Sequence, residues 1–320
     1  MKHYAIRHLT QFSYDEPISE TMMEVRMQPA TLERQRCLQF VIETQPRART
    51  FVYQDFLRNW VHYFDIPRRH RHLTITARAQ VEVSDTPPIP DTLPVATWQE
   101  VERWATQAQY WDYRQPSQFA QWSDAVVGFV DSLAVNTRTR DPLGLVRLVM
   151  EAIHTQFEYA PNATRVDSPV DEVIESRRGV CQDFSHVMIA TLRRVGLPVR
   201  YISGYIAPDN ADVSDPTSIA THAWVEVCLP QLGWIGFDPT HNITTGTRHV
   251  QIASGRDYSD VPPTRGVFKG RAGSVLEVSV EINSAAAPAA VNDVPPAATM
   301  AWSAPRPDDS QEQQQQQQQQ

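Results

Sequence analysis

Three residues of this chain could carry out nucleophilic chemistry together: Cys181, His222 and Asp238. A thiolate attacks an acyl carbon, an imidazole moves the protons, and a carboxylate orients the imidazole. These are the parts that the cleavage of an amide bond needs. Each of the three residues lies at or near the end of a predicted helix or strand. They can act together only if those elements pack against one another.

Cys181 is predicted to open a helix. Apolar residues follow it at the three- and four-residue spacing of one helix face, namely Phe184, Met188, Leu192 and Val195. Gly196 is a suitable residue for the helix C-terminus, and Pro198 excludes continuation. The first turn of a helix has unpaired N–H groups and the positive end of the helix dipole, which stabilise a thiolate over a thiol. The sequence therefore predicts a reactive position for Cys181.

His222 and Asp238 are predicted to meet across a β-hairpin. Residues 221–227 alternate between polar and apolar side chains, as a half-buried strand does, and a second strand is predicted over 233–238. If residues 228–232 form the loop, His222 lies directly opposite Asp238 on the same face of the hairpin. A slip of one residue would separate the two side chains, so the hypothesis depends on the register.

The motifs around these residues resemble the transglutaminase-like superfamily. They are Gly179-Val180-Cys181-Gln182-Asp183-Phe184-Ser185-His186, the run from Arg193 to Tyr205, His222-Ala223-Trp224, Trp234, and Asp238-Pro239-Thr240. The N-terminal third, with Tyr4 to Tyr14 and Phe56-Leu57-Arg58-Asn59, resembles the extra domain of bacterial members. The resemblance implies a papain-like core, with helices packed on an antiparallel sheet, and a Cys-His-Asp triad at Cys181, His222 and Asp238.

This triad would cleave an amide bond through a thioester intermediate. The backbone N–H of Cys181 is the expected first donor to the oxyanion. The second donor stays open, with Gln156 and Tyr159 as candidates from their position upstream. Water acting on the thioester gives hydrolysis, and we favour a peptidase or amidase by analogy with bacterial relatives. The alternatives are a protein-glutamine acyl transferase (transglutaminase) and a catalytically silent peptide-binding module.

A metal site is the competing interpretation of the residues around Cys181. Asp183 and His186 follow the cysteine closely, but the paired CxxC or HxxxH spacing of metal sites is missing. A carboxylate in the first turn of a helix is favoured by the helix dipole, which accounts for Asp183. We expect neither a metal nor another cofactor.

Composition limits the compartment and the partners. The 320 residues carry a formal net charge of −8, which argues against nucleic acid as the main partner. Neither an N-terminal apolar leader nor a membrane-spanning stretch is visible. The chain has three cysteines, Cys37, Cys181 and Cys228. A disulfide framework needs more cysteines than this, and an even number of them. The expected partner is a peptide or protein substrate, without membrane binding, in the cytoplasm.

The predicted fold class is α+β, with four segments along the chain. Alternating strands predict an antiparallel β domain over 1–84, and a proline-rich stretch over 85–95 predicts a linker. The catalytic domain is expected over 96–283, with helices ahead of Cys181 and a last strand near 275–282. The Ala-, Pro- and Gln-rich segment 284–320 is predicted to be disordered.

Overall fold

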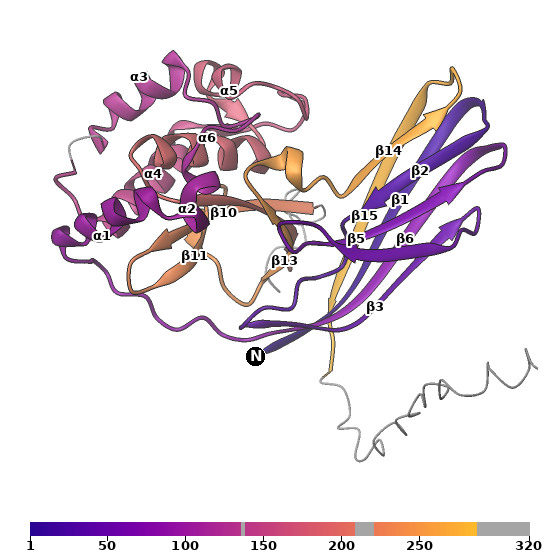
Figure 1. The fold of residues 1–320 in the computed structure, drawn as a ribbon, viewed down its shortest axis with the longest axis horizontal. Coiled ribbons are helices and arrows are strands. Elements are labelled where there is room, and N and C mark those ends of the chain that lie inside the picture. The colour runs from indigo at the N-terminus through magenta and orange to yellow at the C-terminus, as the bar shows by residue number, and fades with distance from the viewer. Residues whose placement is uncertain (136–137, 209–220, 287–320) are drawn as a thin grey trace, which may run out of the picture. The chain divides into compact units, whose positions relative to one another are not determined.

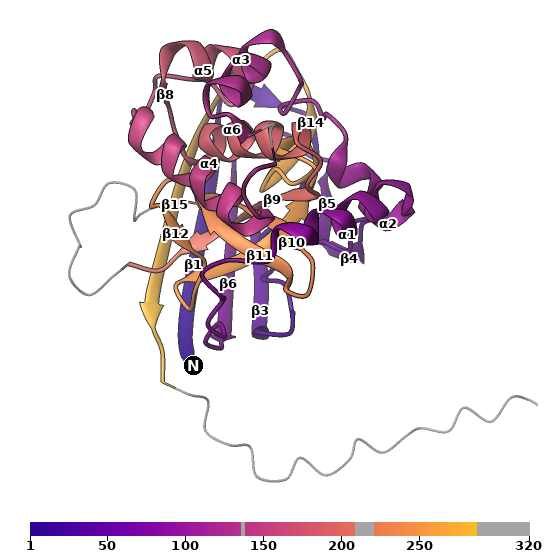
Figure 2. The same cartoon turned by 90° about the vertical axis from the view of Figure 1, so that its left-hand side faces the viewer.

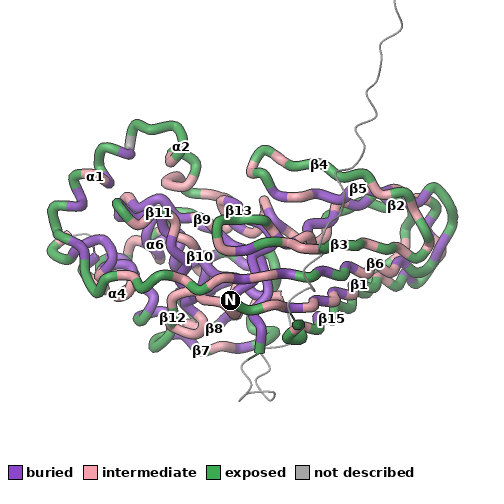
Figure 3. The backbone as a smooth tube through the Cα atoms, turned by 90° about the horizontal axis from the view of Figure 1, so that it is seen from below, coloured by how far each residue is buried: buried purple, intermediate pink, exposed green. Residues whose placement is uncertain are grey.

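The computed structural model describes residues 1–135, 138–208 and 221–286. Residues Met1–Ala286 form one compact unit. The tail predicted over 284–320 lies outside the described residues from residue 287 on. No helix among the described residues combines the length and the apolar character needed to cross a bilayer. Figure 3 shows the buried residues gathered around the central helix and strands of the helical region and alternating along the strands of the β sheets.

The predicted antiparallel β domain consists of two four-stranded sheets. The first sheet has the order β15 (Ser274–Ser284), β1 (Lys2–Ile18), β6 (His70–Val83) and β3 (Gln35–Gln45). The second has the order β14 (Thr264–Lys269), β2 (Glu20–Val25), β5 (Trp60–Ile66) and β4 (Thr50–Gln54). Buried and more exposed residues alternate along β1 and β6, as expected for strands with one face on a core.

The last two strands belong to the β domain by hydrogen bonding. The strand predicted near 275–282 forms as β15, but it pairs with β1 along its whole length (Figure 1). β14 likewise pairs with β2. Residues 264–284 therefore complete the N-terminal sheets, although the sequence places them in the catalytic segment. Alternation identifies a strand but not its partner, which is the physical reason for the difference.

Six α-helices, a five-stranded antiparallel sheet and a short parallel pair of strands make up the rest of the described part of the unit. The helices are α1 (Trp98–Arg103), α2 (Ala108–Trp111), α3 (Asp124–Ser132), α4 (Pro142–Gln156), α5 (Val170–Ser176) and α6 (Cys181–Arg194). The five-stranded sheet has the order β12 (Ile243–Thr244), β11 (Gly233–Asp238), β10 (Thr221–Leu229), β9 (Val199–Ile206) and β13 (His249–Gly255). Helix α6 packs against β9 and β10 and is covered by α3, α4 and α5 (Figures 1 and 2). The predicted α+β class is confirmed.

The helix predicted from Cys181 is confirmed at both ends. It begins at Cys181 and its last residue is Arg194. Gly196 has a φ of +99°, the left-handed conformation that favours glycine at this position. The N–H of Leu197 donates to the carbonyl of Leu192 at 3.1 Å, which closes the helix with a Schellman-type bond.

The hairpin of β10 and β11 has a different register from the predicted one. Leu229 pairs with Gly233, where we expected Val227. The loop therefore covers 230–232, which is shorter than predicted. Gly233 has a φ of +71°, and this left-handed residue allows the chain to reverse in fewer positions.

The shift corrects one prediction and preserves another. His222 does not lie directly opposite Asp238, because the pairing has moved by two residues. A shift of two residues keeps every side chain on its original face of the sheet. His222 and Asp238 therefore still share a face, as diagonal neighbours within reach of long side chains.

Arg193 ties helix α6 to its surroundings. It is 1% exposed, and burial lowers the pKa of its guanidinium to about 10, so it stays charged at neutral pH. The guanidinium donates to the carbonyl oxygens of Val199, Gln115 and Arg256 and to the hydroxyl of Ser117. A buried charge is tolerated only with such a complete set of acceptors.

The β domain meets the five-stranded sheet through side-chain amides. Gln35 donates to the carbonyl of Gln251 at 2.8 Å and accepts the N–H of the same residue at 2.8 Å. Asn59 makes the same pair of bonds to Ser254, at 2.9 and 2.8 Å. Both amides satisfy backbone groups of β13, which is the edge strand of its sheet. The contact between the two parts of the unit is therefore specific.

We expect Arg193→Lys to lower the free energy of unfolding by about 2–4 kcal/mol. The ammonium group of lysine cannot reach all of the acceptors to which the planar guanidinium of arginine donates. Urea unfolding followed by circular dichroism measures the loss. Arg194→Lys is the matched control, since Arg194 is exposed and a change within about 0.5 kcal/mol is expected there. Equal losses in the two variants would contradict the role given to Arg193.

Candidate active site

The N-terminus of α6 is fixed by a buried carboxylate. Asp183 is 2% exposed and accepts the backbone N–H of Val180 at 2.8 Å and the hydroxyl of Thr164 at 2.6 Å. Burial raises the pKa of Asp183, and these two hydrogen bonds oppose that effect. A Cβ atom at Gly179 would lie 2.8 Å from the carboxylate, so only glycine fits there. Cys181 is thus held on a rigid first turn.

The metal site considered around Cys181 does not form with Asp183 and His186. Asp183 turns toward Val180, whereas His186 accepts the N–H of Tyr258 and stacks on Phe119 at 5.4 Å. Burial lowers the pKa of His186 to about 4, so the ring is neutral at neutral pH. Both side chains therefore have structural partners.

His222 is buried against Asp238. The Nε2 atom of His222 donates to Oδ2 of Asp238 at 2.7 Å, with the two residues 4% and 0% exposed. Burial lowers the pKa of His222, but the charge and hydrogen bond of Asp238 and the hydrogen bond and charge of Cys181 raise it to about 10. His222 is therefore positively charged at neutral pH and is bonded to both predicted partners. The structure brings the three predicted residues together.

Asp238 accepts hydrogen bonds on both carboxylate oxygens. Oδ1 accepts the backbone N–H groups of Thr240 and His241, at 3.0 and 3.3 Å. Oδ2 accepts from the rings of His222, His241 and His249, at 2.7, 2.8 and 3.1 Å. Burial would raise the pKa of Asp238, but the charge of His222 and the three imidazole bonds hold it well below its ordinary value of 3.8. The carboxylate therefore stays ionised.

His249 has one tautomer that fits its contacts. Its Nδ1 accepts the N–H of Gly246 at 3.3 Å, so the ring proton must lie on Nε2, which donates to Asp238. Burial lowers the pKa of His249, and the ring is neutral. It can orient the carboxylate without adding a charge.

Sequence reasoning missed His241 and His249. His241 lies three residues after Asp238, within the turn that ends β11, and this spacing could have indicated it. His249 comes from β13, which pairs with β9 two strands away from β11, and its approach to Asp238 has no local signal. Among the described residues, the side chains of His222, Asp238 and His241 form the group with the spacing for a metal ion, with ligand atoms within 4.8 Å of one another. All three are already hydrogen bonded together.

The two candidates for the second oxyanion donor, Gln156 and Tyr159, lie in different elements. Gln156 ends α4 at an exposed site, where its side-chain oxygen accepts from Arg177 at 3.4 Å. Tyr159 lies in the short strand β7 (Glu158–Tyr159), which pairs with β8 (Arg178–Gly179) directly before the nucleophile. Position thus favours Tyr159 over Gln156.

We expect Asp238→Asn to lower the free energy of unfolding most between about pH 4 and pH 6.5. Because the pKa of Asp238 is lowered, its ionised carboxylate stabilises the fold at pH values above the ordinary pKa of 3.8. This stabilisation is lost as the pH falls further. The raised pKa of His222 gives stability that is complete below 6.5 and is lost as the pH rises toward about 10. Urea unfolding of both proteins across pH measures the difference, which should reach about 3 kcal/mol.

Glu281→Gln is the control for this measurement, because Glu281 pairs with Arg7 at an exposed position. Its effect should stay below about 1 kcal/mol at every pH. A difference for Asp238→Asn that does not vary with pH would show that the charge of the carboxylate is unimportant.

Two family profiles match the two structural parts of the chain. The profile described as Transglutaminase-like superfamily matches residues 131–239, a range that contains Cys181, His222 and Asp238. The profile described as Bacterial transglutaminase-like N-terminal region matches residues 4–82, which form most of the β domain.

Individual proteins agree with these profiles. An uncharacterized protein of Mycobacterium leprae is 30% identical over 276 residues, covering 86% of this chain and 96% of its own. A protein-glutamine gamma-glutamyltransferase of Pseudomonas aeruginosa is 31% identical over 108 residues, 32% of this chain and 16% of that protein. The fold resembles the crystal structure of a proposed cysteine protease from Cytophaga hutchinsonii, with a TM-score of 0.69 at 20% identity, covering 89% of this chain and 91% of that one. The chain therefore belongs to the transglutaminase-like superfamily and carries the N-terminal region of its bacterial members.

Proposed function

We propose that the protein is a cysteine-dependent amide-bond hydrolase, a peptidase or amidase, with Cys181 as nucleophile, His222 as acid and base, and Asp238 as the orienting carboxylate. The observation that carries this proposal is the buried His222, which is hydrogen bonded to Asp238 at 2.7 Å and also to Cys181. A charged imidazole between a carboxylate and a sulfur is the arrangement that stores a thiolate at neutral pH.

The acylation step begins with the thiolate of Cys181. The Sγ atom bonds to the carbonyl carbon of an amide, and the carbonyl electrons move to oxygen. Cys181 is the first residue of α6, where backbone N–H groups have no partner within the helix, and its N–H is the proposed donor to that oxyanion. His222 then gives its proton to the amide nitrogen, the C–N bond breaks, and the amine leaves. The acyl group remains on the sulfur as a thioester.

Deacylation reverses these roles with water as the nucleophile. Neutral His222 takes a proton from water, the oxygen bonds to the thioester carbon, and the C–S bond breaks. A carboxylic acid leaves, and the thiolate and imidazolium are restored. Asp238 holds the ring in place throughout and keeps its own charge, because its hydrogen bonds favour the ionised form.

Of the two alternative functions, transamidation has specific support and the silent binding module does not. A primary amine in place of water would give transamidation, and the match to the Pseudomonas aeruginosa gamma-glutamyltransferase favours that alternative over one third of this chain. A silent peptide-binding module would bind peptides at the same site without chemistry. The complete set of Cys181, His222 and Asp238, joined by hydrogen bonds, argues against this second alternative.

We expect Cys181→Ala to abolish product formation on a peptide library, with a loss of at least ~1000-fold, because the nucleophile has no substitute. Mass spectrometry of reactions with and without a primary amine separates cleavage or deamidation from amine adducts. Hydrolysis products that persist when the amine is present support the hydrolase. Amine adducts as the main product support the transferase.

Cys37→Ser is the matched control, since Cys37 lies half-buried in β3 of the β domain. Its activity should equal that of the wild type. Product formation that survives in Cys181→Ala would exclude the proposed chemistry, and no product from any of the proteins would favour the binding module.

We expect iodoacetamide to alkylate Cys181 faster at pH 7 in the wild-type protein than in His222→Ala, because the charged imidazole of His222 stabilises negative charge on the neighbouring sulfur. Peptide mass spectrometry measures each cysteine separately. Cys37 serves as the internal reference: burial raises the pKa of its thiol, so its rate at pH 7 should be low.

The rate of Cys37 should be the same in His222→Ala as in the wild-type protein, because Cys37 lies in β3 of the β domain. Equal rates for Cys181 in the two proteins would mean that His222 does not activate the thiol.

A further inference from the structure

A pocket of about 370 Å³ lies between the β domain and the five-stranded sheet. The wall on the side of the β domain is formed by residues 32–35 together with Val83, Ser84 and Thr86. Trp224, Trp234 and His249 belong to the opposite wall, which the strands of the sheet provide. This volume lies in the range of sites for small molecules, which often form at the junction of two domains.

The walls of the pocket are held in place without a ligand. The paired hydrogen bonds of Gln35 and Gln251 join the two sides at 2.8 Å. Trp224 is 2% exposed, and a Cβ atom at Gly204 would lie 2.5 Å from its ring, so the ring cannot move into the sheet. The Arg200 guanidinium lies 4.4 Å above the ring of Trp234. A preformed pocket needs little reorganisation on binding.

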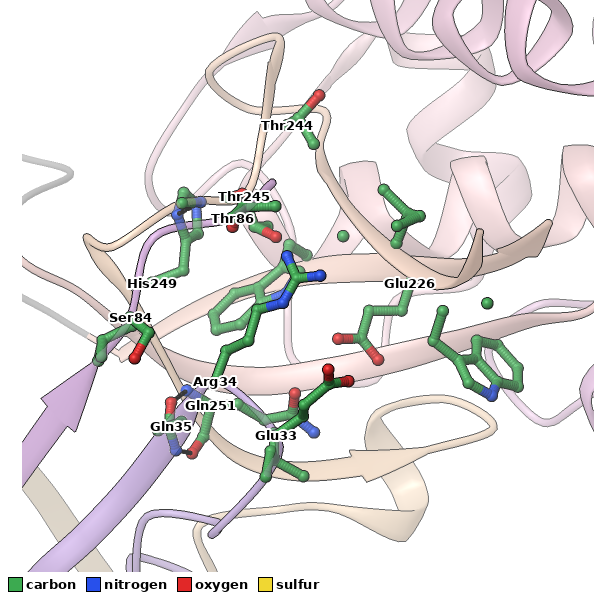
Figure 4. A pocket seen from close by; sticks show the side chains of 18 of the residues that line it. Glu33, Arg34, Gln35, Ser84, Thr86, Glu226, Thr244, Thr245, His249 and Gln251 are labelled. Atoms are coloured by element: carbon green, nitrogen blue, oxygen red, sulfur yellow. Dashed lines mark hydrogen bonds between the residues drawn. The ribbon is translucent and has the colours of Figure 1, made fainter. Parts of the chain in front are cut away.

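The charges in the pocket leave one cation unmatched. Arg200 and Glu226 form an ion pair at 2.5 Å, which offsets both of their charges. Glu33 is exposed at the rim, where water solvates its carboxylate. The half-buried Arg34 extends its side chain into the pocket (Figure 4), and its guanidinium has no ion pair or hydrogen bond within the part of the chain that the structure describes.

We propose that this pocket binds the carboxylate group of a small molecule or of an acidic peptide side chain, with Arg34 as the anion-binding residue. A guanidinium offers two parallel N–H groups that match the two oxygens of a carboxylate. Hydroxyl groups of Thr86, Thr244 and Thr245 line the same space and can supply further hydrogen bonds. The partly exposed ring of Trp234 offers apolar surface to the rest of the ligand.

The position of the pocket links it to the candidate active site. His249 lines the pocket and donates to Asp238 at 3.1 Å. A bound carboxylate would therefore share its pocket with a residue that orients the carboxylate of the triad. The binding itself does not depend on the proposed hydrolase activity, so it can be tested separately.

Ligand-observed NMR with N-acetylglutamate and its neutral isostere N-acetylglutamine tests the proposal on the whole chain. We expect N-acetylglutamate to bind, more weakly at high salt, and N-acetylglutamine to bind at least ~10-fold more weakly. Arg34→Gln should weaken the binding of N-acetylglutamate by a similar factor. The backbone bond from Ser84 to the Arg34 carbonyl at 2.8 Å does not involve the side chain and remains.

Arg36→Gln is the matched control, because Arg36 lies two residues along the same segment, 67% exposed and 3.9 Å from Glu82, and does not line the pocket. It should bind like the wild type. A capped tripeptide with a central glutamate, compared with its glutamine counterpart, shows whether the carboxylate comes from a peptide or from a small molecule. If the glutamate tripeptide binds more tightly than N-acetylglutamate, the ligand is an acidic side chain of a peptide. If the two bind equally, the ligand is a free acid. Equal binding of the acid and its amide, or equal losses in both arginine variants, would overturn the proposal.

Discussion

The carboxylate of Asp238 is the group on which the rest of the site depends. It is completely buried, and five hydrogen bonds from three imidazole rings and two backbone N–H groups keep it ionised. A buried charge without such partners would be strongly destabilising. The end of β11, the turn after it and the start of β13 must therefore keep their positions together. The positive charge of His222 follows from this carboxylate.

The sulfur is positioned by separate means. Asp183 folds back on the first turn of α6, and Gly179 leaves the room that this requires. At the other end, Gly196 closes the helix, and Arg193 fastens it to β9 and to two loops. The helix is thus fixed at both ends against the sheet that carries His222. Buried polar groups with full sets of partners provide this precision, whereas apolar packing alone tolerates small shifts.

Local patterns in the sequence were sufficient for the elements and for the three residues that they bring together. The bounds of α6 and β11 follow from apolar spacing and from glycine and proline at their ends. Partners that are distant in the chain could not be predicted. Nothing near 275–282 indicates pairing with β1, and nothing near His249 indicates Asp238. The hairpin register was wrong by two residues, yet the shared face of His222 and Asp238 survived because side chains alternate with a period of two.

The central claim is that His222 is a cation at neutral pH, held between a carboxylate and a sulfur. The most direct measurement is the ¹⁵N NMR spectrum of the His222 ring across pH, in protein whose thiols are free. We expect both ring nitrogens to remain protonated through about pH 8, with titration near the raised pKa of about 10. A ring that loses its proton near the ordinary value of 6.5 would contradict the claim.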